Sequence, residues 1–151
     1  MDKDIKAVFG KVWPVHVANL TRHVIACRKA FDGDLDMFLV MAVIGERTLS
    51  ERNADPTMDY DGFRSGRGAL SRPLEINLRS IAEFSGIPRE TVRRKLVALE
   101  KKGWISRSED GTLHATRQAA RDLEPLTEAG IQYVAAMMRL IGEVLPARPP
   151  G

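Results

Sequence analysis

The apolar residues of the first fifty positions recur every three or four residues, which is the spacing of one helical face. They predict a helix over residues 3–31 and a second helix over residues 35–47. Pro14 lies inside the first segment, and because proline removes a helix hydrogen bond, we expect a kink or a new helix near Trp13. Asp34 is a suitable N-cap for the second helix, whose almost wholly apolar surface is typical of a buried central helix.

Residues 52–73 interrupt this pattern and predict a long polar loop. Loops of this length in compact domains tend to be functional or mobile. Three of its aspartates do not have the spacing of a calcium-binding loop, so a solvated loop is the simpler interpretation. The turn-forming residues on which the prediction depends are Asn53, Asp55, Pro56, Asp59, Asp61, Gly62, Ser65, Gly66, Gly68, Ser71 and Pro73.

The C-terminal half alternates short helical and extended segments. Apolar spacing predicts helices over residues 76–86 and 88–102, followed by strands over residues 104–107 and 112–115. An Asp-Gly pair between the two strands is a strong signal of a tight hairpin turn. A last helical segment is expected over residues 117–145.

The last helical segment carries two apolar stripes instead of one. Proline is tolerated in a helix's first turn, so the long final helix is expected to begin at Pro125 or Thr127. One stripe would complete the chain's own core, and an adjacent second stripe suggests packing on a partner; a single wide stripe buried within one chain is the alternative. The stripes are Ile131, Val134, Met138, Ile141 and Leu145, and Tyr133, Met137, Leu140 and Val144. A proline-rich tail follows over residues 147–151.

Three residues set the geometry of the two short helices. Ala82, Gly86 and Val92 follow one another at intervals of four and six residues. A small residue lets the second helix cross the first, glycine accepts the left-handed backbone of a tight turn, and valine fills the angle between the helices. This spacing indicates a helix-turn-helix, and the hairpin directly after it makes the unit a winged helix.

The second short helix has an apolar back, formed by Val92, Leu96 and Leu99, and a basic front. Such a helix fits a DNA major groove, where its N-terminal residues meet base edges and an arginine can bridge guanine bidentately. Basic residues near its end and on neighbouring elements are expected to hold phosphates. The predicted DNA-binding residues are Arg79, Pro88, Arg89, Glu90, Thr91, Arg93, Arg94, Lys95, Lys101, Lys102 and Arg107.

Two stretches resemble families of bacterial regulators. Residues 81–105 are similar to the DNA-binding half of GntR-type regulators, whose recognition helix has a Thr-Val-Arg run like the one beginning at Thr91. The run Leu-Thr-Glu-Ala-Gly over residues 126–130 is similar to MarR-type regulators. The order of elements resembles MarR most, and this implies a mostly α fold with a small β-hairpin wing, flanked by N- and C-terminal dimerisation helices.

Length and composition fit one globular domain of 151 residues. Within it we expect N-terminal helices over residues 1–50, the polar loop 52–73, the winged helix-turn-helix over residues 76–116 and the dimerisation helix over residues 117–145. A hydrophobic share of 44% excludes a disordered chain, and the single cysteine excludes an intramolecular disulfide, which fits a reducing cytoplasm. The longest apolar run, residues 37–44, is too short to span a bilayer.

The net charge of +3 is unevenly distributed. Residues 76–108 carry eight bases against three acids, whereas the rest of the chain is nearly balanced. A local basic patch of this kind is typical of nucleic-acid binders, although a solvated helix face can have the same composition.

The histidines and the cysteine give weaker signals. His16 and His23 are two helical turns apart, too far to chelate one ion unaided, and His114 of the hairpin could contact phosphate. Cys27 lies on an apolar stripe where core packing is the default, because a redox switch needs exposure and a low pKa. The sequence has no enzyme motif, so no catalytic residue, metal or cofactor is expected.

Together these patterns predict a cytoplasmic homodimer that binds double-stranded DNA sequence-specifically and regulates transcription. Two alternatives stay open: a winged-helix module for protein–protein interaction, and a phage or plasmid replication or partition factor with the same DNA-binding head. A small-molecule effector, if one exists, would bind between the dimer helices and the DNA-binding head, and no residue identifies it.

Overall fold

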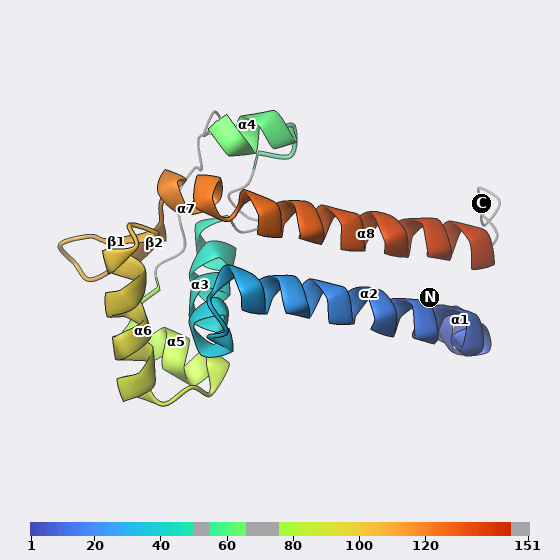
Figure 1. Cartoon of the computed structure of the whole chain (residues 1–151), viewed down its shortest axis with the longest axis horizontal. Coiled ribbons are helices and arrows are strands. Elements are labelled where there is room, and N and C mark those ends of the chain that lie inside the picture. The colour runs from blue at the N-terminus through green and yellow to red at the C-terminus, as the bar shows by residue number, and fades with distance from the viewer. Residues whose placement is uncertain (50–54, 66–75, 146–151) are drawn as a thin grey trace. The chain divides into compact units, whose positions relative to one another are not determined.

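The computed structural model of the chain describes residues 1–49, 55–65 and 76–145. The predicted tail and parts of the predicted polar loop lie outside these ranges. The described chain is mostly helical, with one two-stranded antiparallel hairpin (Figure 1). The prediction of a mostly α fold with a small β-hairpin is therefore confirmed.

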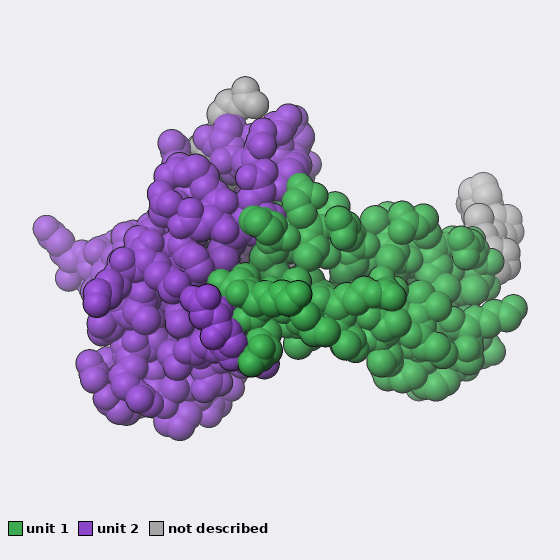
Figure 2. Space-filling model, in the orientation of Figure 1, with its two compact units in different colours: residues 1–30, 125–151 green, residues 31–124 purple. Residues whose placement is uncertain are grey.

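The chain divides into two compact units (Figure 2). The first comprises residues 1–30 and 125–151, and the second comprises residues 31–124. The N-terminal block expected over residues 1–50 is therefore shared between the two units.

The first unit contains α1 (Asp2–Ala7), α2 (Phe9–Ala30) and nearly all of α8 (Glu124–Val144). The alternative of a new helix near Trp13 is wrong, because α1 ends at Ala7, α2 begins at Phe9, and α2 continues through Pro14. Proline removes the amide that would bond the carbonyl four residues earlier and crowds that carbonyl, which disfavours a continuous helix without excluding one. The expected helix start is confirmed at the other end of the chain, where Pro125 lies in the first turn of α8.

The long helices α2 and α8 run side by side (Figure 1). They meet through an aromatic cluster of His16, His23 and Tyr133. The Tyr133 hydroxyl lies 3.0 Å from Nδ1 of His16, and the Tyr133 ring stacks on the ring of His23 at a centroid distance of 5.8 Å. Leu140, from the same stripe of α8, is buried, whereas Val134 and Met138 of the other stripe are 53% and 70% exposed. The two apolar stripes of α8 thus have different surroundings within one chain.

The second unit is built around α3 (Leu35–Thr48), which packs against α5 (Leu78–Ser85), α6 (Arg89–Lys101) and strand β2 (Leu113–Ala115). These contacts bury Met37, Val40, Met41, Val43 and Ile44. The predicted central helix is confirmed, but its burial is confirmed on one side only, because Leu35 and Leu39 remain 40% and 44% exposed. The most deeply buried side chains of the unit are Phe31, Val40, Ile44, Ile81, Val92, Leu96, Leu99 and Leu113.

Asp34 begins α3, as predicted, and also fastens it to α6. Its Oδ1 accepts a hydrogen bond from the Met37 amide at 2.9 Å, and its Oδ2 accepts one from Nζ of Lys95 at 2.6 Å. Burial raises the pKa of the Asp34 carboxyl, but the hydrogen bonds from Lys95 and Met37 outweigh this effect and leave the pKa below its ordinary value. One carboxylate therefore caps the central helix and holds its neighbour.

The hairpin follows α6 directly. Strand β1 (Ile105–Arg107) pairs antiparallel with β2, with Ser106 opposite His114. Gly111 in the connecting turn has φ of 85°, which explains why the turn needs glycine there. A short helix, α7 (Arg117–Asp122), continues the chain after the hairpin.

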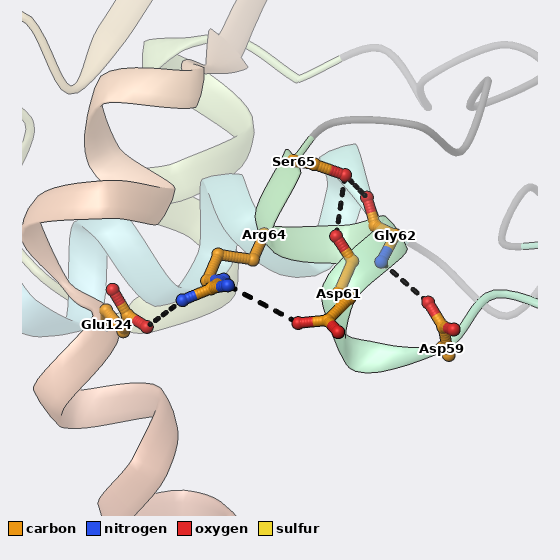
Figure 3. A network of polar contacts seen from close by, with 6 residues as sticks. All are labelled: Asp59, Asp61, Gly62, Arg64, Ser65 and Glu124. Carbon is orange, nitrogen blue, oxygen red and sulfur yellow. Dashed lines mark hydrogen bonds and ion pairs between the residues drawn. The ribbon is translucent and has the colours of Figure 1, made fainter.

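Part of the segment predicted as a polar loop is helical, so that prediction is wrong for α4 (Tyr60–Ser65) (Figure 3). Asp59 starts this helix, because its Oδ1 accepts a hydrogen bond from the Gly62 amide at 2.6 Å. The Arg64 guanidinium lies 3.4 Å from Asp61 and 3.2 Å from Glu124. Aspartate and glycine favour turns, but aspartate is equally suited to cap a helix, and the capping role prevails here.

We expect Asp34→Ala to lower the free energy of unfolding by about 1–2 kcal/mol, because it removes the N-cap of α3 and the partner of Lys95. Asparagine is an equally good N-cap, so Asp34→Asn should lose only the ion pair and be the milder change. Urea unfolding at neutral pH checks this order. Equal stability of Asp34→Ala and wild type would contradict it.

The contribution of the Asp34–Lys95 ion pair to the free energy of unfolding should depend on pH. Because the pKa of Asp34 is lower in the folded than in the unfolded protein, its carboxylate stabilises the fold above the unfolded pKa of about 3.9. This stabilisation is lost as the pH falls through the folded pKa. The difference in unfolding free energy between wild type and Asp34→Asn should therefore shrink below about pH 4. A difference independent of pH would refute the pair's contribution.

Candidate nucleic-acid interface

A tight turn fixes α6 against α5. Asn77 caps α5 by accepting a hydrogen bond from the Ser80 amide at 3.1 Å. Gly86 ends α5 with φ of 73°, the left-handed conformation predicted for it. Ala82 is 9% exposed and Val92 is fully buried, as their expected places in the angle between the helices require. The residues from Ala82 to Val92 therefore set the direction in which α6 leaves the turn.

The back of α6 is buried and its opposite side is exposed. Val92, Leu96 and Leu99 are no more than 1% exposed. Because this stripe is fixed in the core, the side chains on the opposite side of the helix point outward. We call the exposed residues of this helix the α6 face; they are Arg89, Glu90, Arg93, Arg94, Val97 and Lys101.

An ion pair orients one arginine of the α6 face. Nε and Nη2 of Arg93 donate to the two carboxylate oxygens of Glu90 at 2.9 and 2.7 Å. The hydrogen bond to Arg93 lowers the pKa of Glu90, and the same bond raises the pKa of Arg93, so both groups stay ionised at neutral pH. Such a bidentate geometry is more ordered than a single contact, although both side chains remain exposed to solvent.

Acidic partners neutralise most of the eight bases of residues 76–108. Five of them lie within 4.0 Å of a carboxylate: Arg79, Arg93, Lys95, Lys102 and Arg107. The other three, Arg89, Arg94 and Lys101, form no salt bridge within the described part of the chain. Arg94 lies 3.5 Å from the Thr91 hydroxyl, and its charge helps to lower the pKa of Glu90. All three belong to the α6 face, so the excess positive charge of this segment gathers there.

Two predicted DNA-binding lysines turn away from the α6 face. Lys95 is paired with Asp34 at 2.6 Å, and its side chain is only 22% exposed. Lys102 lies 3.5 Å from Asp32, and its ammonium sits 4.9 Å from the centre of the Trp104 ring. Both lysines therefore help to hold the turn before α3 against α6.

The other predicted DNA-binding residues surround the α6 face. Arg79 of α5 is paired with Glu83 of the same helix at 2.7 Å. Pro88 is the exposed N-cap residue of α6. Arg107, on β1, is paired with Glu100 at 3.1 Å. These cations are solvent-accessible, but a phosphate would have to compete with the acids that already hold them.

Trp104 anchors the hairpin at the end of α6. Its indole Nε1 donates to Oδ2 of Asp122 at 2.8 Å, and its ring meets Phe31 edge-on at a centroid distance of 5.3 Å. Hydrogen bonds from Gln118 and then Trp104 lower the pKa of Asp122. At the far end of the hairpin His114 lies 2.9 Å from the Ser108 hydroxyl. The hairpin is thus held at its base by α7 and the core.

Two exposed apolar residues near this interface are absent from the sequence-based site. Val97 is 52% exposed on the α6 face, and Phe84 of α5 is 62% exposed with the Arg47 guanidinium 5.8 Å from its ring centre. The sequence spacing could have indicated Val97, because it follows Arg93 and Arg94 by four and three residues and therefore lies on the same side of the helix. Phe84 has no comparable signal in the sequence.

The structure gives no support for a redox switch at Cys27 or for a metal site among the described residues. Cys27 is 1% exposed, and burial raises the pKa of its thiol, which is the opposite of what a redox switch needs. Among the described residues no group of three histidine, cysteine or carboxylate side chains could hold a metal ion. No helix in the described ranges is both long and apolar enough to cross a membrane.

Comparison with known proteins finds no counterpart: no protein-family model, curated protein or solved structure matches this chain.

Lys95 and Lys101 should respond differently to truncation. We expect Lys95→Ala to lower the free energy of unfolding by about 1–2 kcal/mol, because it leaves the partly buried Asp34 carboxylate without its partner. Lys101→Ala, on the exposed side of the same helix, should change it by less than about 0.5 kcal/mol. Urea unfolding of the two variants checks this. Equal losses would show that Lys95 has no special structural role.

Proposed function

We propose that this protein binds double-stranded DNA as a winged helix-turn-helix and regulates transcription as a homodimer. The α6 face is the observation that carries the proposal. Its three cations that form no salt bridge among the described residues, Arg89, Arg94 and Lys101, lie on one exposed side of a helix whose back is fixed in the core. A helix with a rigid back and a basic exposed side has the form that major-groove recognition requires. The resemblance to MarR-type regulators supports the same function.

The arginines of the α6 face are suited to recognise bases. Arg89 stands at the N-terminal end of α6, and Arg93 and Arg94 follow one turn later. Arginine offers two parallel N–H groups to the N7 and O6 acceptors of guanine. Glu90 restrains the Arg93 side chain before DNA arrives, which reduces the conformational entropy lost on binding.

Phosphate contacts would come from the edges of this surface. Lys101 lies at the C-terminal end of α6, and Arg79 and Arg107 lie on the neighbouring elements. Contacts to phosphates position the protein on the duplex and supply salt-dependent affinity, but they carry no sequence information. The hairpin that holds Arg107 takes the place of a wing in this proposal.

The first unit supports the homodimer. Its buried apolar residues are Val12, Cys27 and Leu140 among the described positions, which is a small core for two helices of more than twenty residues. Beside this core, both long helices leave apolar residues in water. The exposed stripe of α2 consists of Phe9, Trp13, Val17, Leu20 and Val24, and the exposed stripe of α8 consists of Ile131, Val134 and Met138. Contiguous apolar surface of this kind marks an interaction site, and a second copy offers the same stripes in return.

Selection of bound duplexes from a random DNA pool tests the function directly. We expect an enriched pseudo-palindrome with half-sites about one helical turn apart. Arg93→Ala should weaken binding to this site by about 1–3 kcal/mol and relax the preference at one base pair. Lys101→Ala should weaken binding to all sequences about equally and reduce the slope of log K against log salt by about 0.9. Binding titrations at two salt concentrations measure both effects.

Unchanged DNA affinity in both variants would show that the α6 face is not the interface. Glu46→Gln, an exposed change on α3, serves as the control and should leave the site preference intact.

The homodimer is tested by a charge placed on the exposed stripe of α8. We expect Val134→Glu to yield a monomer, because an unpaired carboxylate buried in the interface would cost several kcal/mol. Gln132→Glu adds the same charge at an exposed polar position of α8 and should leave the dimer intact. Sedimentation equilibrium measures the masses. A monomeric wild-type protein, or a dimer unaffected by Val134→Glu, would contradict the proposal.

A second candidate function is a protein-interaction module, which Phe84 and Arg47 favour. Their side chains form an exposed cation–π pair, and aromatic and arginine residues are enriched in interaction hot spots. If the random pool yields no enriched site and no salt-sensitive binding, this second function takes precedence.

A further inference from the structure

The α6 face contains one apolar side chain among five charged ones. Val97 is 52% exposed, although the core-facing residues on either side of it in sequence, Leu96 and Leu99, are buried. It lies on the same side of the helix as Glu90, Arg93 and Lys101, which are seven, four and four residues away from it. A single exposed valine is common on proteins, but this one occupies the middle of the surface that would face DNA.

The neighbouring arginines leave the Val97 methyl groups uncovered. Arg93 extends toward Glu90, and Arg94 extends toward Thr91, so both guanidinium groups reach toward the N-terminal end of α6. Side chains in a helix lean toward its N-terminus, so Val97 covers the turn that carries these two arginines. The apolar spot is therefore flanked by the two groups best suited to bind guanine.

Neither the core nor the helix needs valine at this position. The apolar back of α6 is formed by the buried Val92, Leu96 and Leu99. At an exposed helical site a β-branched residue forms helix less readily than alanine. The side chain therefore contributes an exposed pair of methyl groups and little to stability.

We propose that Val97 recognises the C5-methyl group of thymine in the major groove. This inference rests on the proposed DNA-binding function. The thymine methyl is the one apolar group that distinguishes a base edge in this groove, and apolar side chains recognise it by contact. Val97 thus adds a thymine preference to the guanine preference of the arginines.

The geometry of α6 predicts where this thymine lies. Arg93 and Val97 are four residues apart, which is about 6 Å along a helix. Successive base pairs are spaced by about 3.4 Å, so a helix lying along the groove would place the two contacts about two base pairs apart. The thymine recognised by Val97 should therefore lie within about two base pairs of the guanine recognised by Arg93.

Replacement of thymine by uracil removes only the methyl group and tests the inference. The duplex selected by the wild-type protein is resynthesised with uracil at one thymine per half-site in turn, and its affinity is compared with the parent duplex. Arg93→Ala identifies one guanine, because this variant no longer prefers guanine at that base pair. At one thymine close to this guanine we expect uracil to weaken binding about fourfold per half-site, which corresponds to the free energy of burying one methylene-sized group. The other thymines should tolerate the change.

Val97→Ala should bind the thymine and uracil duplexes equally, because it lacks the γ-methyl groups that make the contact. It should fold as stably as wild type, since the site is exposed and alanine favours helix. Val97→Thr retains one methyl group and should keep part of the preference. Leu39→Ala, which shortens an exposed apolar side chain of α3, is the matched control and should keep all of it.

Three results would overturn the inference. If uracil is tolerated at every thymine by the wild-type protein, the protein makes no methyl contact. If Val97→Ala keeps the same ratio of thymine to uracil affinity, another residue makes that contact. Both results leave the proposed DNA binding standing, whereas the absence of any enriched duplex refutes the proposed function and this inference with it.

Discussion

The arrangement of the second unit depends on the burial of one face of α6. Val92, Leu96 and Leu99 are almost completely removed from water, and burial of each such side chain is worth about 1.5–3 kcal/mol. Rotation of the helix about its axis would expose this stripe and bury charged residues, which is costly. The turn at Gly86 and the capped start of α3 at Asp34 hold the two neighbouring helices in the positions that this burial needs. The positions of the buried apolar residues therefore determine which residues of α6 are exposed to solvent.

The acidic residues of the second unit determine where its positive charge is available. The sequence shows an excess of five bases over acids in residues 76–108, spread over two helices and a strand. In the folded chain the three acids of that segment pair with three arginines, and Asp32 and Asp34 pair with two lysines. Exposed pairs of this kind add little stability, but they lower the charge that an anion would meet nearby. The remaining positive charge is that of the α6 face.

The sequence predicts most of the helices and the hairpin, because each depends on short-range signals. Gly86, Asp34 and the Asp-Gly turn act on their immediate neighbours, and the apolar stripe of α6 is visible in its spacing. The features that the sequence does not show have long-range or competing causes. It does not reveal the ion pair of Lys95, because the partner, Asp34, is 61 positions away in the chain. It does not predict the helix α4, because aspartate and glycine serve turns and helix starts equally well. Nor does Pro14 begin a new helix, since α2 continues through it.

The two units each have a surface that one chain leaves unused, which would link the proposed DNA binding with the proposed dimerisation. The α6 face has three cations that form no salt bridge among the described residues, and a surface that made so few phosphate contacts would bind DNA weakly at physiological salt. A second copy would double these contacts on one duplex, and joining two weak sites raises the affinity far above that of either. The first unit differs, because the apolar stripes of its long helices are exposed to water and do not pack in its small core. Packing these stripes against those of a second copy would stabilise the first unit. The same dimer would bring a second α6 face, so dimerisation would both bury the apolar stripes and double the DNA-binding surface.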